Sequence, residues 1–293
     1  MRRRGALAGL ALLPVAAAAQ QPYTLEGTEV HELGAYTLFI ALPASYKTAA
    51  ARRYPVLFVT DANYAFPLVR SIGRRVGDQG RGLDEFILVG LGYARGDTPE
   101  YSRRRDYTPS AGGDRDATSD MPGRPPLFGQ AEAYRRYIAE AVFPFIEKTY
   151  RADMARKVFA GHSYGALLGV HVLFTAPAMF GHYVLGSPSL WFDRRVMFAR
   201  EKAYAGEHRD LPARVLLAAG AFEAVRQGDR RYNRDIDIVH DMLAFEQALK
   251  SRRYPGLRIA SQVIADEDHL SVAPAILTRG LRWALPPARA GFP

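Results

Sequence analysis

The sequence of 293 residues contains no cysteine. This absence excludes a disulfide framework, a thiolate zinc site, a cysteine nucleophile and a lipid-modified N-terminal cysteine. Lysine is also scarce, since only five of the 39 basic residues are lysines and the other 34 are arginines. The arginines are spread along the chain among 30 acidic residues and form no long basic arm, despite a net charge of +9. The composition therefore argues against nucleic-acid binding and favours an anionic small molecule as partner.

A membrane-spanning helix needs about 18 uninterrupted apolar residues, and no run of the chain reaches that length. The N-terminus has instead the pattern of a signal peptide. Arg2-Arg3-Arg4 precede a short apolar run at 5–15, and Ala17-Ala18-Ala19 fit a small-residue cleavage site. We predict that residues 1–19 are a signal peptide and that the mature protein is periplasmic or secreted, with no membrane contact after the peptide is removed. An uncleaved anchor is the alternative.

Short apolar segments alternate with helical patterns along the rest of the chain. The segments 56–59 and 215–219 are apolar throughout, as expected for parallel strands covered on both faces. This alternation predicts one α/β domain over residues 20–293, with a mostly parallel sheet, helices on both faces and an N-terminal antiparallel hairpin over 23–42. The expected strands are 36–42, 56–60, 86–92, 157–160, 183–186, 214–219 and 258–265, and the expected helices are 131–150, 164–175, 236–250 and 272–283.

The segment 94–130 breaks this alternation, because it is rich in Gly, Pro, Asp and Arg and has little apolar periodicity. Such a long stretch is usually either a functional loop or a disordered insertion. It follows the expected strand 86–92 and so leaves from the carboxyl edge of the sheet, where open α/β sheets bind their ligands. We predict a loop or lid on the substrate side, with a surface insertion as the alternative.

The motif Gly161-His162-Ser163-Tyr164-Gly165 lies between an expected strand and an expected helix. This G-x-S-x-G context is typical of a nucleophile elbow, a sharp turn that lifts a serine hydroxyl above the sheet. Glycines on both sides allow the close backbone approach, and the helix N-terminus stabilises an oxyanion. The motif predicts Ser163 as nucleophile and the backbone N–H of Tyr164 as one oxyanion donor.

A histidine base should follow the serine, because this fold orders its residues serine, acid, histidine. His269 is the candidate, since it lies in a loop between the last expected strand and the last expected helix. The other six histidines are less suitable. His31 precedes the serine, and His162 is its neighbour with the ring turned away. The remaining four are expected in or near helices or in a charged stretch: His171, His182, His208 and His240.

The acid is expected after the strand 214–219, where Glu223 could reach His269 from the side opposite Ser163. Asp229, Asp235 and Asp237 remain alternatives. A second oxyanion donor is expected in the segment after the strand 56–60, from the backbone N–H of Ala62 or Asn63.

Several blocks carry a resemblance to a known family. The chain resembles the putative-esterase (esterase D-like) family of α/β-hydrolases over about residues 25–285, and within it the periplasmic siderophore esterases that cut enterobactin-type trilactones. The blocks are YPVLFVTDAN at 54–63, GLGY at 90–93, RRDYTP at 104–109, PFIE at 144–147, the elbow, and GSPSLWFD at 186–193.

The resemblance implies that Ser163 and His269 carry the reaction and that Arg105, Tyr107 and Trp191 border the substrate. It also implies a serine esterase that needs no metal or organic cofactor. Ala62 departs from the family, which usually has glycine there. Some relatives work with a Ser–His pair alone, which leaves the acid open.

The predicted substrate is a catecholate siderophore ester, because neighbouring arginines suit an anionic ferric complex and an indole suits an aromatic ring. A carboxylesterase acting on acylated sugars, feruloyl or other aryl esters is one alternative. A non-catalytic relative that binds siderophores is the other.

Overall fold

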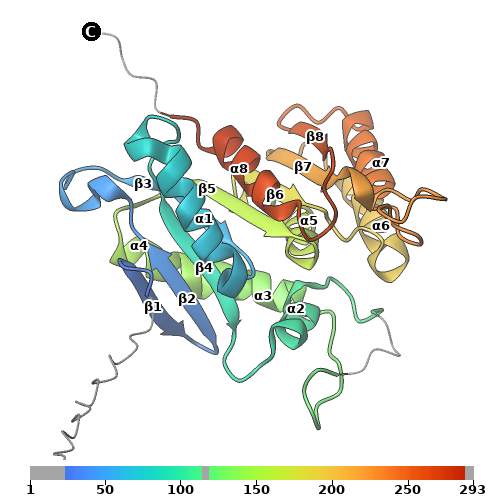
Figure 1. The fold of residues 1–293 in the computed structure, drawn as a ribbon, viewed down its shortest axis with the longest axis horizontal. Helices are drawn as coiled ribbons and strands as arrows, with labels where there is room; N and C mark the ends of the chain where they lie inside the picture. Colours follow the sequence, from blue (N-terminus) through green and yellow to red (C-terminus); the bar gives the residue numbers. More distant parts are fainter. Residues whose placement is uncertain (1–23, 114–118, 288–293) are drawn as a thin grey trace, which may run out of the picture.

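The computed structural model describes residues 24–113 and 119–287, so the predicted signal peptide lies outside the described residues. Within them, one eight-stranded sheet has the order β1-β2-β4-β3-β5-β6-β7-β8 (Figure 1). The strands are β1 (Thr28–Leu33), β2 (Tyr36–Ala41), β3 (Tyr54–Val59), β4 (Ile87–Ala94), β5 (Ala152–His162), β6 (His182–Gly186), β7 (Arg214–Gly220) and β8 (Arg258–Ile264).

The sheet is parallel from β4 to β8 and antiparallel at its N-terminal edge. β1 pairs with β2 and β2 pairs with β4 in antiparallel ladders, while all other neighbours are parallel. The predicted α/β class, the mostly parallel sheet and the edge hairpin are therefore confirmed. The parallel strands all end at one edge, which holds the residues that follow β3, β5, β6 and β7.

Helices cover both faces of the sheet. In Figure 1, α1 and α8 lie on the near face, and the apolar clusters place α3 to α7 on the other. The helices are α1 (Ala62–Gly77), α2 (Pro99–Tyr107), α3 (Ala131–Tyr137), α4 (Phe143–Thr149), α5 (Tyr164–Thr175), α6 (Phe192–Glu207), α7 (Ile238–Ser251) and α8 (Ala273–Ala284).

Alternating side chains of the central strands feed two separate apolar cores. In β3, Val56 and Phe58 pack with α3 to α7, whereas Leu57 and Val59 pack with α1 and α8. All four side chains are buried, which explains why the strand is apolar throughout. Burial of each such side chain contributes about 1.5–3 kcal/mol, so the two cores fix the central strands firmly.

Three helices were not expected from the sequence. α1 buries Ala65, Phe66 and Val69 on one face, but Pro67 and two glycines interrupt its helical pattern, while α6 is rich in charge and shows no clear apolar stripe. The prediction that 94–130 is irregular throughout is wrong in one part, because α2 forms there. Thr98 caps α2 by accepting a hydrogen bond from Tyr101 N–H, and Pro99 occupies the first helical position.

The expected helix 131–150 forms with a change of winding in its middle. A π-helical turn at Ile138–Val142 separates α3 from α4. Pro144 lies just after this turn, where a regular helix would force its ring against the carbonyl of Glu140. The wider turn relieves that clash and keeps the two helices continuous.

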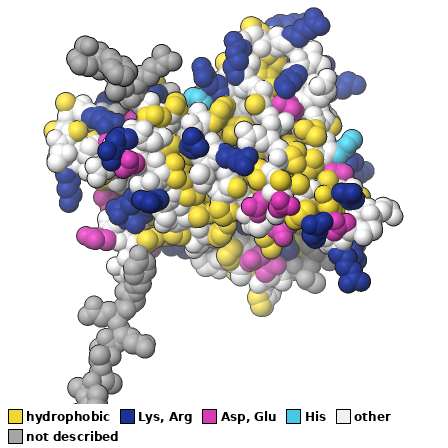
Figure 2. Space-filling view, turned by 45° about the horizontal axis from the view of Figure 1, so that its top comes forward, with side chains coloured by type: hydrophobic (Ala, Val, Ile, Leu, Met, Phe, Trp, Pro, Cys, Tyr) yellow, Lys and Arg dark blue, Asp and Glu magenta, His cyan; other side chains and the backbone are white. Residues whose placement is uncertain are grey.

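None of the helices in the part of the chain that the structure describes is long and apolar enough to cross a membrane. On the face drawn in Figure 2, arginines and lysines are scattered among acidic and apolar side chains rather than gathered in one stripe. This distribution agrees with the even spread of arginines along the sequence.

Candidate active site

Ser163 occupies a strained turn between β5 and α5. Its φ of 59° and ψ of −119° lie outside the regions that L-residues prefer. A hydrogen bond of 2.9 Å from Ser163 N–H to the Gly186 carbonyl oxygen ties the turn to β6. A Cβ on Gly161 would lie 2.5 Å from the Gly165 carbonyl group, and one on Gly165 would collide with Thr60. Both glycines are therefore needed for the turn to close, as the motif predicts.

The hydroxyl of Ser163 and the ring of His269 are within hydrogen-bond distance. Ser163 Oγ lies 3.1 Å from His269 Nε2. The loop that follows β8 brings His269 to the carboxyl edge, 106 residues after the serine. The histidine chosen from its place in the sequence is thus the one whose ring reaches Ser163.

Glu223 lies on the opposite side of the imidazole. Its Oε1 is 2.5 Å from His269 Nδ1, while Oε2 accepts hydrogen bonds from Ser187 Oγ at 2.7 Å and from Gly220 N–H at 2.6 Å. The Glu223 side chain is 1% exposed. We call Ser163, His269 and Glu223 the Ser–His–Glu array. Of the alternative acids, Asp229 pairs with Arg231 and Asp237 caps α7, while His269 Nδ1 is met by Glu223 rather than by Asp235.

Sequence reasoning missed the serines after β6. Ser187 is fully buried and holds Glu223, and Ser189 Oγ lies 3.4 Å from Ser163 Oγ. Both belong to the GSPSLWFD block, and their position directly after a buried strand was the available clue. Polar side chains at that point of a parallel sheet face the same edge as the elbow.

His162 packs against the ring of His269. The two ring centroids are 4.7 Å apart at an interplanar angle of 40°. Burial, with smaller contributions from the neighbouring His269 and Arg103, lowers the pKa of His162 to about 3. The ring is therefore neutral at physiological pH and forms an uncharged wall beside His269.

The first turn of α1 lies beside the elbow. Thr60 N–H donates to the Ala160 carbonyl oxygen at 3.1 Å, which joins the end of β3 to β5. The N–H groups of Tyr64 and Ala65 bond to the Asp61 carbonyl oxygen, whereas those of Ala62 and Asn63 have no acceptor within 24–113 and 119–287. Unpaired N–H groups at a helix start are suited to bind an oxyanion.

Asp61, which precedes this turn, is buried in a polar cluster. Its Oδ1 accepts hydrogen bonds from Arg103 Nε and Tyr93 OH, each at 2.7 Å, and its N–H donates to Tyr107 OH at 3.3 Å. Burial raises the pKa of Asp61, and the Arg103 guanidinium opposes that shift. The cluster fixes Asp61 in a left-handed conformation with φ of 55°, and thereby fixes the start of α1.

A cavity of about 210 Å³ lies next to the elbow residue Tyr164. Aromatic rings form much of its wall, and Arg104 adds a cation. The Trp191 ring centroid is 6.1 Å from that of Tyr164, so the indole is part of this wall. The lining residues are Arg104, Gly112, Gly113, Phe128, Tyr164, Trp191, Phe192 and Asp193.

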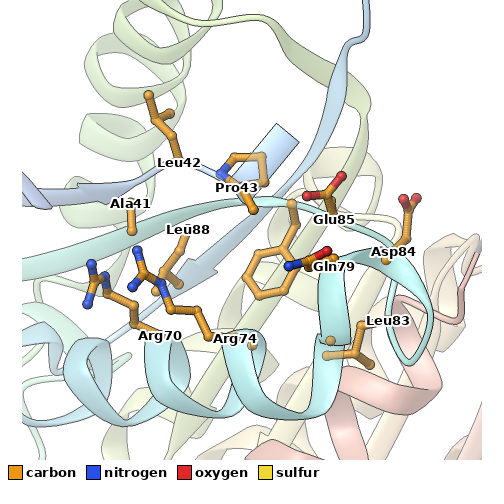
Figure 3. A pocket seen from close by; sticks show the side chains of 15 residues that line it. Ala41, Leu42, Pro43, Arg70, Arg74, Gln79, Leu83, Asp84, Glu85 and Leu88 are labelled. Atoms are coloured by element: carbon orange, nitrogen blue, oxygen red, sulfur yellow. The ribbon is translucent and has the colours of Figure 1, made fainter. Parts of the chain in front are cut away.

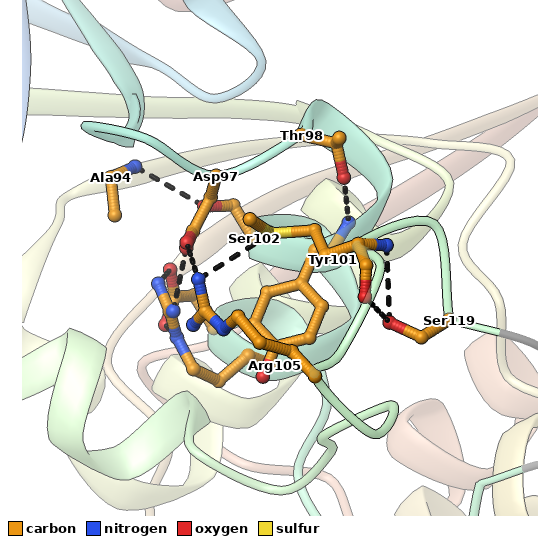
Figure 4. Close-up of polar contacts among 10 residues, drawn as sticks. Ala94, Asp97, Thr98, Tyr101, Ser102, Arg105 and Ser119 are labelled. Atoms are coloured by element: carbon orange, nitrogen blue, oxygen red, sulfur yellow. Dashed lines mark hydrogen bonds and ion pairs between the residues drawn. The ribbon is translucent and has the colours of Figure 1, made fainter.

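The structure places Arg105 and Tyr107 away from this cavity. Arg105 donates to Asp97 at 2.6 Å and to both carboxylate oxygens of Asp106 at 2.8 Å (Figure 4). Tyr107 is 1% exposed and lies behind Asp61. Their geometry supports α2 and the oxyanion segment, whereas the neighbouring Arg104 lines the cavity.

Another cavity lies at the opposite edge of the sheet. It has a volume of about 430 Å³ and is lined by α1 and the start of β4, including Leu83, Phe86 and Leu88 (Figure 3). β4 begins there and runs toward the Ser163 edge, so this cavity is remote from the array. Among the described residues, no group of three or more His, Asp and Glu side chains could hold a metal ion.

The fold and the Ser163 turn define an ester hydrolase of the α/β-hydrolase class. Among solved structures, the BES protein from Bacillus cereus is similar with a TM-score of 0.75 and 26% identity, covering 92% of this chain and 99% of that one. Siderophore hydrolase EstA from Aspergillus nidulans has a TM-score of 0.72 at 22% identity, covering 90% and 97%, a likeness of fold alone.

Sequence comparisons identify the family. The ferri-bacillibactin esterase BesA of Bacillus subtilis is 32% identical over 282 residues, which cover 90% of this chain and 92% of the relative. The siderophore enterobactin esterase of Emericella nidulans is 25% identical over 275 residues, which cover 85% and 89%. The family model described as "Putative esterase" matches residues 33–223. The chain belongs to this putative-esterase family and is a carboxylic ester hydrolase.

Proposed function

We propose that the Ser–His–Glu array hydrolyses siderophore esters through an acyl-enzyme. Ser163 Oγ attacks the ester carbonyl carbon while His269 Nε2 accepts the hydroxyl proton. The tetrahedral intermediate then collapses, and His269 returns that proton to the leaving alkoxide. A water molecule attacks the acyl-enzyme, gives its proton to His269, and releases the carboxylic acid and Ser163. The single observation that carries this proposal is the unbroken chain of contacts from Ser163 Oγ to Glu223, of 3.1 and 2.5 Å.

The oxyanion of each intermediate is held by backbone donors in this proposal. The Tyr164 N–H follows the nucleophile, and the N–H groups of Ala62 or Asn63 stand at the start of α1. One such donor typically contributes about 3 kcal/mol to transition-state binding. Ala62 in place of the usual glycine adds only a methyl group, because the backbone freedom is required at Asp61 rather than at residue 62.

The proposed substrate is an aryl-bearing, anionic trilactone of the catecholate type. One feature of the site supports it: the aromatic cavity beside Tyr164, which suits one catechol ring and has the Arg104 guanidinium in its wall. The names of the relatives, a ferri-bacillibactin esterase and an enterobactin esterase, support the same class. We also propose export of the mature protein to the periplasm or beyond, on the pattern of residues 1–19.

The test is chromatography with mass detection of a cyclic catecholate trilactone, iron-free and ferric, incubated with the enzyme. Ser163→Ala should lower ring opening by at least about a thousandfold, since the acyl-enzyme cannot form. Ser71→Ala, a serine on α1 far from the array, is the matched control and should retain the rate. Ring opening that persists in Ser163→Ala would exclude this nucleophile. Hydrolysis of a small activated ester without any ring opening would exclude the substrate and direct the search to acylated sugars and aryl esters.

A further inference from the structure

A third cavity, of about 390 Å³, is formed by the segment between β7 and α7. We call residues 225–234 the Arg loop, which belongs to the orange segment that links these elements in Figure 1. A bridge between Val225 and Asn233 closes the base of the loop. Arg226, Arg230 and Arg234 all line the cavity. The loop begins two residues after Glu223, the acid of the array.

Backbone hydrogen bonds attach the Arg loop to the segment that carries His269. Asn233 N–H donates to the carbonyl oxygens of Phe222 at 2.9 Å and Ala224 at 3.0 Å. Phe222 N–H in turn donates to the Glu267 carbonyl oxygen at 3.0 Å, two residues before His269. The Arg loop is therefore attached next to His269, on the face of that ring where Glu223 lies.

The charge in this cavity is unbalanced. The one acid among its lining residues, Asp229, is engaged by Arg231 at 2.7 Å. Within 24–113 and 119–287, the side chains of Arg230 and Arg234 form no ion pair. Arg226 lies over the Tyr232 ring at 5.2 Å and donates a hydrogen bond of 3.4 Å to the Tyr232 hydroxyl, which holds its guanidinium at the cavity. Three guanidinium groups thus line one small volume that contains a single carboxylate, that of Asp229.

One exposed apolar side chain lines the cavity with these cations, and another lies next to His269. Leu270, directly after His269, is 81% exposed, and Val225 at the base of the Arg loop is 38% exposed. Exposed apolar groups next to arginines suit a ligand that is both aromatic and negatively charged. A ferric tris-catecholate fits this description, because six phenolate oxygens around one Fe³⁺ form a multiply charged anion with aromatic faces. The iron-free ligand lacks that concentrated charge.

We propose that the Arg loop is a second anionic subsite, which holds the ferric tris-catecholate part of the substrate while its ester linkage lies at Ser163. This inference rests on the proposed siderophore-esterase function. It assigns to the loop a preference for the ferric complex over the iron-free ligand, with Leu270 and Val225 contacting the ligand's aromatic surface.

Binding is measured first, in Ser163→Ala protein so that the ligand stays intact. Quenching of tryptophan fluorescence by a ferric and an iron-free catecholate trilactone gives the two Kd values. Arg226→Gln, Arg230→Gln and Arg234→Gln combined should weaken ferric binding about tenfold and iron-free binding less than threefold. The matched control combines Arg74→Gln, Arg75→Gln and Arg209→Gln, which removes equal charge from exposed positions elsewhere and should leave both Kd values unchanged. Equal ferric Kd values for the two triple variants would overturn the subsite.

Turnover then separates the subsite from the function on which it rests. Both triple variants are then made in the active enzyme, and KM is measured for the ferric trilactone and for a neutral small ester. The ratio of the first KM to the second should rise about tenfold in the Arg loop variant and stay unchanged in the control variant. High salt should reduce the ferric preference of the wild type, because it screens exposed charges. Ring opening without dependence on the Arg loop would refute the subsite and keep the esterase. Arginine-dependent ferric binding without any ring opening would refute the proposed function and keep the subsite.

Discussion

Two buried carboxylates stand at the carboxyl edge of the sheet, Asp61 after β3 and Glu223 after β7. Asp61 is paired directly with the guanidinium of Arg103, at 2.7 Å. Among the described residues, Glu223 is met by the neutral donors Ser187 Oγ and Gly220 N–H and by the ring of His269. A carboxylate already paired with a guanidinium has little charge left to act on another group. One held by neutral donors can instead stabilise the positive imidazolium that forms during acyl transfer.

The first test of this contrast is Glu223→Gln. We expect kcat/KM to fall by about 10³–10⁴, because an amide neither stabilises the imidazolium nor selects its tautomer. The matched control is Glu201→Gln. Glu201 is another buried carboxylate, which lies on α6 and pairs with Arg252. Steady-state ester hydrolysis of both variants gives the comparison. A loss of less than tenfold in Glu223→Gln would mean that Ser163 and His269 suffice as a pair.

The second test breaks the Asp61–Arg103 pair. Asp61→Asn and Arg103→Gln should each lower the free energy of unfolding by about 2–3 kcal/mol, because each leaves a largely buried partner uncompensated. The value is reduced here for the partial exposure of Arg103, whose side chain is 26% exposed. Urea unfolding of both single variants and the double variant measures the coupling. Additive losses would show that the pair contributes nothing as a unit.

Buried histidines make the stability of the protein depend on pH, because burial keeps their rings neutral, even at His171, whose ring lies 3.2 Å from Glu132. Burial lowers the pKa of His162 to about 3 and that of His171 to about 4, with Arg200 adding to the shift at His171. Both rings are then neutral in the folded protein, whereas they titrate near pH 6.5 when unfolded. Between pH 6.5 and about 4 the unfolded chain binds more protons, so stability falls as the pH falls.

At pH 5.5 each of these rings should cost about 1.4 kcal/mol relative to pH 7.5. Urea unfolding at the two pH values measures the loss. The two rings together account for part of the stability difference between the two pH values. His171→Asn removes one of the rings and should therefore remove about half of that part. An unchanged pH dependence in His171→Asn would contradict the assignment.

The smallest expected effect belongs to Ser187→Ala, which removes one of the two neutral donors to Glu223 Oε2. We expect kcat/KM to fall about fivefold, as for the loss of one hydrogen bond to a charged group. Ser189→Ala is the control, since its 3.4 Å contact with Ser163 Oγ is long, and it should change the rate less than twofold. Equal effects of the two would remove the distinction between them.

The parts of this structure that could be predicted are those coded by local pattern. β3 and β7 read as unbroken apolar runs because both of their faces are covered, and α5 begins where the elbow requires it. His269 followed from the order of the strands. These features depend on the chain's own periodicity and on rules of parallel sheets.

The parts that could not be predicted depend on partners distant in sequence. α2 is held by ion pairs of Arg103 with Asp61 and of Arg105 with Asp97 rather than by an apolar stripe. Without such a stripe the sequence cannot tell which of three consecutive arginines faces the cavity. The family resemblance implied Arg105 at the substrate, whereas Arg104 lines the cavity beside Tyr164.

Because β3 and β5 are neighbours in the sheet, the sheet sets a distance within the active site. The nucleophile turn and the segment with the oxyanion donors are about a hundred residues apart in the chain, yet Val59 is in register with Ala160 and Thr60 bonds to the same residue. Adjacent strands have a fixed spacing of about 4.8 Å. The separation between attacking oxygen and oxyanion donors is thus set by a ladder of peptide groups, which side-chain evolution leaves unchanged. The pockets on either side can therefore change to accept new esters while the distance between nucleophile and oxyanion donors stays the same.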